Sequence, residues 1–379
     1  MLFSAGEFTL IENERCFTSA DFIPQQRSSA SAYIEVKYQP TSTNSLIVSA
    51  MLQALVNAQA YGIPVIFNRT SQDIELSELP EGCAVGILTS GTTGAPKLVY
   101  HQLEALLPKN TKVSDAKTCW LLCYHPMSYA GLQVILQAIV ANDTLVVDVD
   151  ASLQKKSQLA IELNVTAISA TPSFMRTLLM AWHQRQPELR LISLGGEIAE
   201  QSTLDTLKRQ FPRASIRHIY ATTETGVIFS VKDGLAGFPF EWCNTVVNGW
   251  LLKIDDTLKL IKGNVEIDTG DCIQSTSSRV IFSGRADNVV NIGGVKVNLE
   301  LLEQQIIAFD IILDARVYVK ANPITGFLTC VEICTEDEEK ARRVLRAFFS
   351  GLAPASRPRV ITFSKQIALN LSGKKQRIV

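Results

Sequence analysis

The stretch LTSGTTGAPK at Leu88–Lys97 is the most informative part of this 379-residue chain. It follows the apolar run CAVGIL at 83–88, which predicts a buried strand that runs directly into a loop. Two glycines let the backbone come close to an anion, and four hydroxyls with the backbone N–H groups can donate to phosphate oxygens. Lys97 adds a positive charge, so we expect this loop to hold phosphate. The loop is not a P-loop, because no Ser or Thr follows the lysine.

Helix-like and strand-like segments alternate on both sides of the loop. Strands that alternate with helices of about 10 to 15 residues imply crossover units and a largely parallel sheet. The predicted strands are 64–68, 83–90, 117–124, 144–150, 165–171, 189–195 and 215–221, and the predicted helices are 45–62, 129–141, 152–164, 172–185 and 201–211.

The pattern changes after residue 226. Residues 226–283 lack long helical stretches and include a hairpin pattern that turns at Asp255–Asp256, which indicates a small antiparallel subdomain. The remaining residues predict a separate α+β module of helix, hairpin, helix and closing strand, at 299–309, 315–334, 336–352 and 359–367.

The predicted fold class is therefore α/β with two domains. A large N-terminal domain at 1–284 has a mainly parallel sheet and an antiparallel subdomain at about 226–283. A small α+β domain at 285–379 follows it, with the boundary near Gly284–Asn288.

The composition is that of an ordinary globular protein, with 46% hydrophobic residues, 19% charged residues and a net charge of −1. No Lys/Arg block stands out, so we expect neither nucleic acid nor a membrane as a main partner. The N-terminus does not resemble a signal peptide, and the most apolar windows, 46–55 and 132–140, are too short or too interrupted to span a bilayer. We therefore expect a cytoplasmic protein.

The eight cysteines include Cys119/Cys123 and Cys330/Cys334, which lie inside apolar runs. We expect small buried hydrophobes here, because no CxxC pair occurs and the chain has only four histidines as further zinc ligands.

Further motifs follow the loop along the chain. They are Tyr220-Ala221-Thr222-Thr223-Glu224, Thr269-Gly270-Asp271, Gly284-Arg285-Ala286-Asp287, the run NIGGVKV at 291–297, and Ser372-Gly373-Lys374. Together with the loop, and in this order, they resemble the signature motifs of the adenylate-forming superfamily of acyl-CoA synthetases, adenylation domains and luciferases. Each motif alone is a common turn or a solvated tail, whereas the whole ordered set makes the resemblance strong. The short stretch before Thr89 implies a shortened member.

The resemblance implies a site for ATP, and each match has a physical reason. Tyr220 offers a flat face to adenine, and Asp271 and Arg285 can reach the ribose hydroxyls. Thr223 and Glu224 are oxygen ligands suited to Mg²⁺ and phosphate, with Glu224 as the metal ligand. The predicted cofactor-binding residues are Thr89, Ser90, Gly91, Thr92, Thr93, Gly94, Lys97, Gly196, Glu197, Tyr220, Asp271 and Arg285.

The resemblance also implies two half-reactions. A small-molecule carboxylic acid attacks the α-phosphate of ATP, pyrophosphate leaves, and a thiol of CoA or of carrier-protein phosphopantetheine then attacks the acyl carbon. Catalysis of this kind rests on positioning and charge stabilisation, and the predicted catalytic residues are Lys374, Thr223 and Glu224. The C-terminal domain is expected to rotate about a hinge at Asp287, which brings in either Lys374 or the Gly293–Lys296 face.

The acyl pocket is predicted around HPMSYAGL at 125–132, which has no Asp that could hold an α-ammonium group. Amino-acid activation is therefore disfavoured, and the mixed aromatic and apolar residues favour an aryl or medium acyl acid. The predicted lining residues are His125, Met127, Tyr129 and Ala221, of which Ala221 stands where the family usually has Gly.

Two alternatives remain open at this point. The acyl group could pass to an amine, or the chain could be a degenerate nucleotide-binding protein without turnover. The presence of Lys97, Glu224, Asp271, Arg285 and Lys374 argues against the second. The motifs identify neither the acid nor the acceptor, which is CoA or an acyl carrier protein in the leading hypothesis. A shortened N-terminal region that exposes apolar surface favours a homodimer.

Overall fold

The computed structural model describes residues 2–3, 7–27, 31–39, 46–70, 73–74, 76, 78–89, 97–109, 117–182, 185–370 and 373–377. The chain forms two compact units. Unit 1 comprises Met1–Ala170, Gln184–Ile192 and Ala221–Gly226, and unit 2 comprises Thr171–His183, Ser193–Tyr220 and Val227–Val379. The predicted domain boundary, between residues 1–284 and 285–379, is a different division of the chain. It describes which part is expected to move during the reaction, and it stays a prediction.

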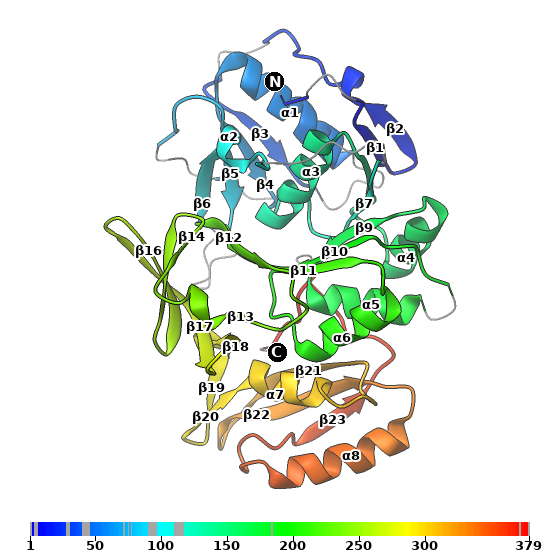
Figure 1. Ribbon diagram of the computed structural model, residues 1–379, viewed down its shortest axis with the longest axis vertical. Helices are drawn as coiled ribbons and strands as arrows, with labels where there is room; N and C mark the ends of the chain where they lie inside the picture. The colour runs from blue at the N-terminus through cyan, green and yellow to red at the C-terminus, as the bar shows by residue number, and fades with distance from the viewer. Residues whose placement is uncertain are drawn as a thin grey trace. The chain divides into compact units, whose positions relative to one another are not determined.

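Unit 1 contains mainly parallel strands (Figure 1). A four-stranded sheet is parallel except for its last strand and has the order β3-β4-β5-β6, at Ile34–Lys37, Val65–Asn68, Ala84–Leu88 and Leu98–Gln102. A second set of neighbours is parallel except for β2 and has the order β9-β7-β8-β1-β2, at Ala167–Ala170, Cys119–Leu122, Thr144–Val147, Thr9–Glu12 and Arg15–Thr18. The predicted parallel strands are confirmed, whereas the strands β1, β2, β3 and β6 were not expected.

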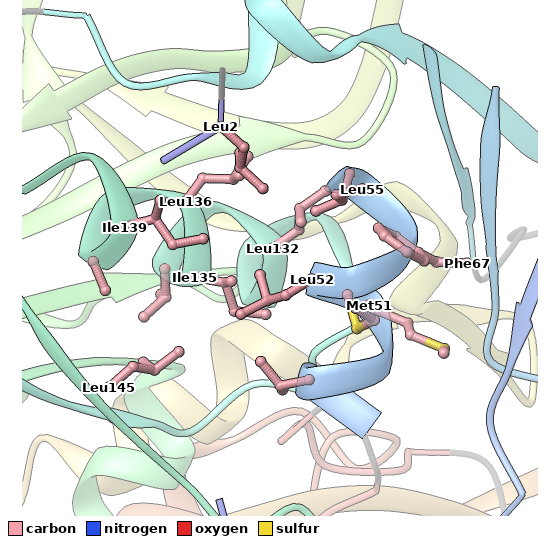
Figure 2. Close-up of a cluster of buried hydrophobic side chains, with 14 of the residues drawn as sticks. Leu2, Met51, Leu52, Leu55, Phe67, Leu132, Ile135, Leu136, Ile139 and Leu145 are labelled. Carbon is pink, nitrogen blue, oxygen red and sulfur yellow. The ribbon is translucent and has the colours of Figure 1, made fainter. Parts of the chain in front are cut away.

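The helices of unit 1 cover these strands and build its core. They are η1 (Ser19–Asp21), α1 (Ile47–Tyr61), α2 (Leu103–Leu106), α3 (Tyr129–Ala141) and α4 (Leu153–Glu162). Figure 2 shows Met51 and Leu52 of α1 beside Leu132 and Ile135 of α3, all four fully buried. α1 ends where Gly62 takes a left-handed conformation with φ of 65°, which a residue without Cβ adopts easily.

The first part of unit 2 joins strands of the α/β type to an antiparallel sheet. β12 (Gly226–Val231), β11 (Ser215–Thr222) and β10 (Leu191–Gly195) are neighbours in that order, with helices α5 (Pro172–Ala181) and α6 (Gln201–Gln210). The antiparallel sheet has the order β13-β18-β17-β16-β15-β14, at Phe238–Pro239, Arg279–Arg285, Val265–Ser275, Thr257–Lys262, Trp250–Ile254 and Val246–Val247, and η2 spans Phe240–Trp242. The predicted turn at Asp255–Asp256 is confirmed, since it joins β15 to β16.

The rest of unit 2 is the predicted α+β module. Its elements are η3 (Ala286–Asn288), the hairpin β19–β20 (Val289–Ile292, Val295–Asn298), α7 (Leu299–Ile307), β21 (Asp314–Asn322), β22 (Gly326–Cys334), α8 (Glu338–Gly351) and β23 (Val360–Phe363). Leu302 of α7 and Leu345 of α8 share one core cluster with Val317 and Val331 of the β21-β22-β23 sheet. The predicted helices, hairpin and closing strand are therefore confirmed.

None of the helices in the described part of the chain is long and apolar enough to cross a bilayer. All eight cysteines are free, and Cys123, Cys330 and Cys334 are buried as expected, whereas Cys119 is half-buried. Burial raises the pKa of the Cys123 thiol to about 12, so this side chain behaves as a small hydrophobe.

Candidate functional site

In unit 2, Asp271 joins two other predicted nucleotide residues. It faces Arg285 directly across the β17–β18 pair, and Nη1 of Arg285 lies 3.3 Å from its Oδ1. The hydroxyl of Tyr220 donates to Oδ2 of the same carboxylate. Burial raises the pKa of Asp271 above its usual value, although Tyr220 and Arg285 act in the opposite direction. The structure therefore brings together the residues that the sequence assigned to the ribose.

The ring of Tyr220 is held by aromatic neighbours. It stacks on Phe229 and on Phe282, with ring centroids 5.1 Å apart in both pairs. Burial raises the pKa of Tyr220 well above its usual value, so the hydroxyl stays a donor. The stacks fix the ring plane, and the expected stacking on adenine stays a prediction.

The end of β18 and the turn η3 that follows it are held by contacts of Arg285 and Asp287. Nε of Arg285 lies 3.0 Å from Oδ1 of Asp287, and the backbone N–H of Arg285 donates to Glu300 of α7 at 2.8 Å. Gly284 has φ of +118°, and a Cβ there would come within 2.8 Å of Oδ1 of Asn298. Glycine is therefore required at this turn, where the sequence places the expected hinge.

Lys374 lies in a short loop that rests on the beginning of α5. The hydroxyl of Thr171, the N-cap of α5, donates to the carbonyl of Gly373 at 2.6 Å. A Cβ on Gly196 would lie 3.7 Å from Cε of Lys374, so the lysine side chain runs past this glycine. The positive charge of Lys374 opposes the rise that burial causes in the pKa of Asp271. Lys374 and Gly196 therefore join the Asp271 cluster, whereas Ser372 lies outside the described residues.

The segment SLGGE at 193–197, which contains the predicted residues Gly196 and Glu197, also contacts α5. Gly196 has φ of +80°, a left-handed conformation that suits glycine. The carboxylate of Glu197 accepts from the backbone N–H of Ser173 at 3.0 Å, in the first turn of α5, where the helix dipole favours an anion. Both residues predicted from this segment thus lie against the helix that supports the Lys374 loop.

A buried charge network, which the sequence did not reveal, supports this loop. Lys375 donates to Asp314 at 2.7 Å and to Glu303 at 3.1 Å, and its side chain is fully buried. Arg377 pairs with Glu303 and Glu300. Arg176 of α5 pairs with Asp314 and with Glu200, the N-cap residue of α6. We call these seven residues the buried charge network. The pair Lys374-Lys375 has the sequence pattern of a solvated tail. Nothing in the local sequence indicates that Lys375 is buried.

Unit 1 contains both ends of the loop at 88–97 that the sequence predicts to hold phosphate. The backbone N–H of Thr89 donates to the carbonyl of Lys97 at 2.8 Å, which closes the loop between β5 and β6. Thr89 is buried, and the Lys97 side chain is exposed. The predicted residues Ser90, Gly91, Thr92, Thr93 and Gly94 lie outside the described residues.

The segment that follows β11 contacts β6, the strand after the predicted phosphate loop. A ring nitrogen of His101 in β6 lies 2.6 Å from the carbonyl oxygen of Thr223. Thr222 accepts from the backbone N–H of Thr225 at 3.1 Å, and Glu224 is exposed between them. No sequence motif includes His101, and its contact with this segment is visible only in the structure.

The exposed carboxylate of Glu224 and the hydroxyl of its neighbour Thr223 are suitable ligands for Mg²⁺. This ion binds few protein carboxylates and shares the oxygens of a bound phosphate. Among the described residues, no three His, Cys, Asp or Glu side chains gather as a metal site. A single carboxylate such as Glu224 agrees with the donor set of a nucleotide-bound ion.

Two of the predicted acyl-pocket residues are buried in unit 1. Met127 is fully buried in the core, and Nδ1 of His125 accepts from the backbone N–H of Met127 at 3.2 Å. Burial lowers the pKa of His125 to about 4, so the ring is neutral at pH 7. Tyr129 lies with its ring 5.6 Å from that of His101, and Ala221 is half-buried. Their role as a pocket lining stays a prediction.

Comparisons with known proteins bear on the family and the fold of the chain. A family model described as AMP-binding enzyme matches residues 21–263. The D-alanine–D-alanyl carrier protein ligase of Staphylococcus haemolyticus is 25% identical over 337 residues, which covers 77% of this chain and 69% of the relative.

Two solved structures have the same fold at low sequence identity. An anthranilate CoA ligase in complex with anthranoyl-AMP is 14% identical with a TM-score of 0.70, and 98% of this chain and 93% of that chain are covered. The o-succinylbenzoate coenzyme A synthetase from Bacillus subtilis, in complex with ATP and magnesium ion, is 15% identical with a TM-score of 0.62. The match covers 99% of this chain and 96% of that chain. The family match, the shared fold and the ordered motifs lead to one conclusion: this chain belongs to the AMP-binding enzymes, the adenylate-forming ligase superfamily.

Proposed function

We propose that this protein activates a carboxylic acid as its acyl-adenylate, with release of pyrophosphate, and then transfers the acyl group to the thiol of CoA or of carrier-protein pantetheine. The observation that carries the proposal is the place of Lys374, which runs past Gly196 and acts on Asp271. A lysine at this place can neutralise the charge that moves between the carboxylate and the α-phosphate.

The first half-reaction needs a held nucleotide. Asp271 accepts hydrogen bonds from the ribose hydroxyls, and Arg285 holds this carboxylate in place through the ion pair across β17 and β18. Tyr220 orients Asp271 through its hydroxyl and faces adenine. Lys374 donates to the acid and to the α-phosphate, which lowers the barrier through charge stabilisation in a preorganised site.

The residues of unit 1 would hold the other phosphates. The loop closed by Thr89 and Lys97 binds them through its N–H groups and hydroxyls. Thr223 and Glu224 would hold Mg²⁺, which supplies positive charge to the departing pyrophosphate. His101 keeps Thr223 in place through its backbone carbonyl, so it is a positioning residue.

The second half-reaction needs room for a thiol. We infer that residues 285–379 turn about Asp287, which removes Lys374 and brings in the Gly293–Lys296 face. Gly293 and Gly294 form the tip of the β19–β20 hairpin with φ of 58° and 87°. Small residues at such a tip leave space for a pantetheine arm.

The acid is proposed to be aryl or medium acyl. HPMSYAGL contains no acidic residue that could hold an α-ammonium group. The anthranilate CoA ligase gives an aryl precedent, whereas the D-alanine ligase is an amino-acid precedent with a carrier-protein acceptor. Transfer of the acyl group to an amine is the second candidate function. Identifying the acceptor distinguishes it from transfer to a thiol.

The experiment measures pyrophosphate release by the full chain with ATP, Mg²⁺ and a panel of aryl, medium acyl and amino acids. Release stimulated by an aryl or medium acyl acid supports the proposal. CoA, phosphopantetheinylated carrier protein and amines are then added in separate reactions, and mass spectrometry identifies the product. Absence of stimulation by every acid overturns acid activation, and a product that forms only with amines overturns the thiol step.

A further inference from the structure

The C-terminal part of the chain is strongly basic, which the net charge of −1 hides. Residues 340–379 contain ten Lys and Arg residues and no Asp or Glu, so the first 339 residues hold the other 26 basic and all 37 acidic residues. Three of the ten, Lys374, Lys375 and Arg377, belong to the site and its buried charge network. The other seven basic residues lie in α8 and in the segments on either side of β23, so they form no contiguous basic block in the sequence.

A groove lies between α8 and β23, which are close together in Figure 1. Its volume is about 270 Å³, and its floor is formed by Leu345, Phe349, Ile361 and Phe363. Leu345 and Phe349 are one helical turn apart on α8, and Ile361 and Phe363 alternate on one face of β23. The floor is therefore an apolar strip that stays open, with Ile361 38% exposed.

Four arginines, Arg342, Arg346, Arg357 and Arg359, line the same groove. Together with the apolar floor they define what we call the arginine groove. The carboxylate of Glu338 already pairs with Arg342 at 2.6 Å, and Arg342 also covers the ring of Phe363 at 4.4 Å. The guanidinium of Arg357 donates to the carbonyls of Leu352 and Ser350, both at 2.7 Å, so it has a structural role.

Arg346 and Arg359 differ from the other two. Both are exposed, and neither has a carboxylate at ion-pairing distance among the residues that the structure describes. They come from the two sides of the groove, one from α8 and one from the residue before β23. Two unneutralised guanidiniums beside an apolar strip select a ligand that is both acidic and apolar.

We propose that the arginine groove docks an acidic amphipathic segment of a partner protein. Apolar side chains of the segment lie on the floor, and its carboxylates pair with Arg346 and Arg359. A protein segment fits better than nucleic acid, because the Phe349 ring is buried and the Phe363 ring is covered by Arg342, which leaves little aromatic surface for base stacking. It fits better than a membrane surface, because the apolar residues lie in a groove rather than on a protruding helix face.

The test uses the full chain and a fluorescein-labelled peptide of about 20 residues, made of Leu and Glu with Leu on one face. Fluorescence anisotropy measures its affinity at about 50 mM and about 300 mM salt. We expect Arg346→Glu with Arg359→Glu to weaken binding by about tenfold or more, and the higher salt to weaken binding to the native chain. The neutral pair Arg346→Gln with Arg359→Gln should lie between the two.

The matched control reverses two exposed charges of unit 2 far from the groove in sequence, Arg213→Glu with Lys253→Glu. Unchanged peptide affinity in this control supports the proposal. Equal loss in the control, or full binding by the Arg346 and Arg359 variants, overturns it. Phosphatidylglycerol vesicles and single-stranded DNA are tested in parallel, and tighter arginine-dependent binding of either one overturns the choice of a protein partner.

Acid-dependent pyrophosphate release is measured on the same variants. It should be unchanged, because Arg346 and Arg359 contact none of the residues assigned to the nucleotide or the acid. The outcome of the docking experiment is therefore separate from the outcome for the proposed function.

Discussion

Nε of Arg176 in α5 lies 2.8 Å from Oδ1 of Asp314 at the start of β21, and both side chains are buried. The same oxygen of Asp314 accepts from Lys375 at 2.7 Å. One carboxylate thus ties helix α5, the C-terminal sheet and the segment that carries Lys374. In the proposed reaction cycle this contact belongs to the adenylate-forming arrangement, and rotation about Asp287 would have to break it.

Replacing Arg176 by Met should lower the free energy of unfolding by about 3–5 kcal/mol, because Asp314 and Glu200 would lose a buried partner. Urea unfolding at pH 7 measures the change. Arg213→Met, at an exposed position, is the control and should stay within about 0.5 kcal/mol of the native chain. Equal stability of the two variants would show that the ion pair contributes nothing.

Replacing Lys374 by Ala should slow acid-dependent pyrophosphate release by about 10²–10³, the usual effect of removing a donor to a developing negative charge. Thermal unfolding should be unchanged, because the side chain is exposed. Lys365→Ala removes another exposed lysine and should keep full activity. An unaffected Lys374 variant would remove the basis of the proposed mechanism.

Replacing Tyr220 by Phe should weaken ATP binding by about threefold to tenfold, since one hydrogen bond is worth about 0.5–1.5 kcal/mol. The stacks with Phe229 and Phe282 remain, while Asp271 loses its hydroxyl donor. Isothermal titration with ATP measures the affinity. Tyr100→Phe is the control, because its buried hydroxyl has no partner among the described residues. A Tyr220 variant with native affinity would refute the orienting role.

Acid should destabilise the protein through Glu303. Burial alone would raise the pKa of this carboxyl, but Arg377 and Lys375 outweigh burial and hold it at about 2, below its ordinary value of 4.5. The folded state therefore binds fewer protons than the unfolded state between these values, and stability is lost as pH falls from 4.5 toward 2.

Glu303→Gln tests this dependence in urea unfolding from pH 7 to pH 3. The variant should be less stable at pH 7, because Lys375 and Arg377 lose their shared partner, and its stability should fall less steeply with acid. Glu266→Gln, at an exposed position, should keep the native slope. Identical slopes for native chain and Glu303→Gln would contradict the assignment.

Local sequence patterns predicted much of the architecture. The strand and helix assignments between 45 and 222 hold because hydrophobic periodicity and Gly or Pro boundaries act over a few residues. The motif resemblance assigned both Asp271 and Arg285 to the ribose, and the β17–β18 register places the two residues opposite each other. The strands β1, β2, β3 and β6 were missed, since their sequences TLIE, RCFT, IEVK and LVYHQ contain polar residues and form no continuous apolar run like AVGIL of β5.

The site residues that the sequence did not predict make their contacts with residues far away in the chain. His101 meets Thr223 across 122 positions in the chain, and Arg176 meets Asp314 across 138. Contacts at such separations leave no periodic pattern, because each partner looks like an ordinary surface residue in its own segment.

The sequence by itself determined the family, the order of the motifs and most of the regular elements, because these depend on residue types and short-range spacing. Only the tertiary structure decided that Lys375 is buried beside an exposed Lys374, and that Thr171 and Gly196 support that lysine. It also decided that Arg346 and Arg359 share one groove. The physical reason is that burial and charge pairing depend on which segments pack together, and that choice is made by the whole chain.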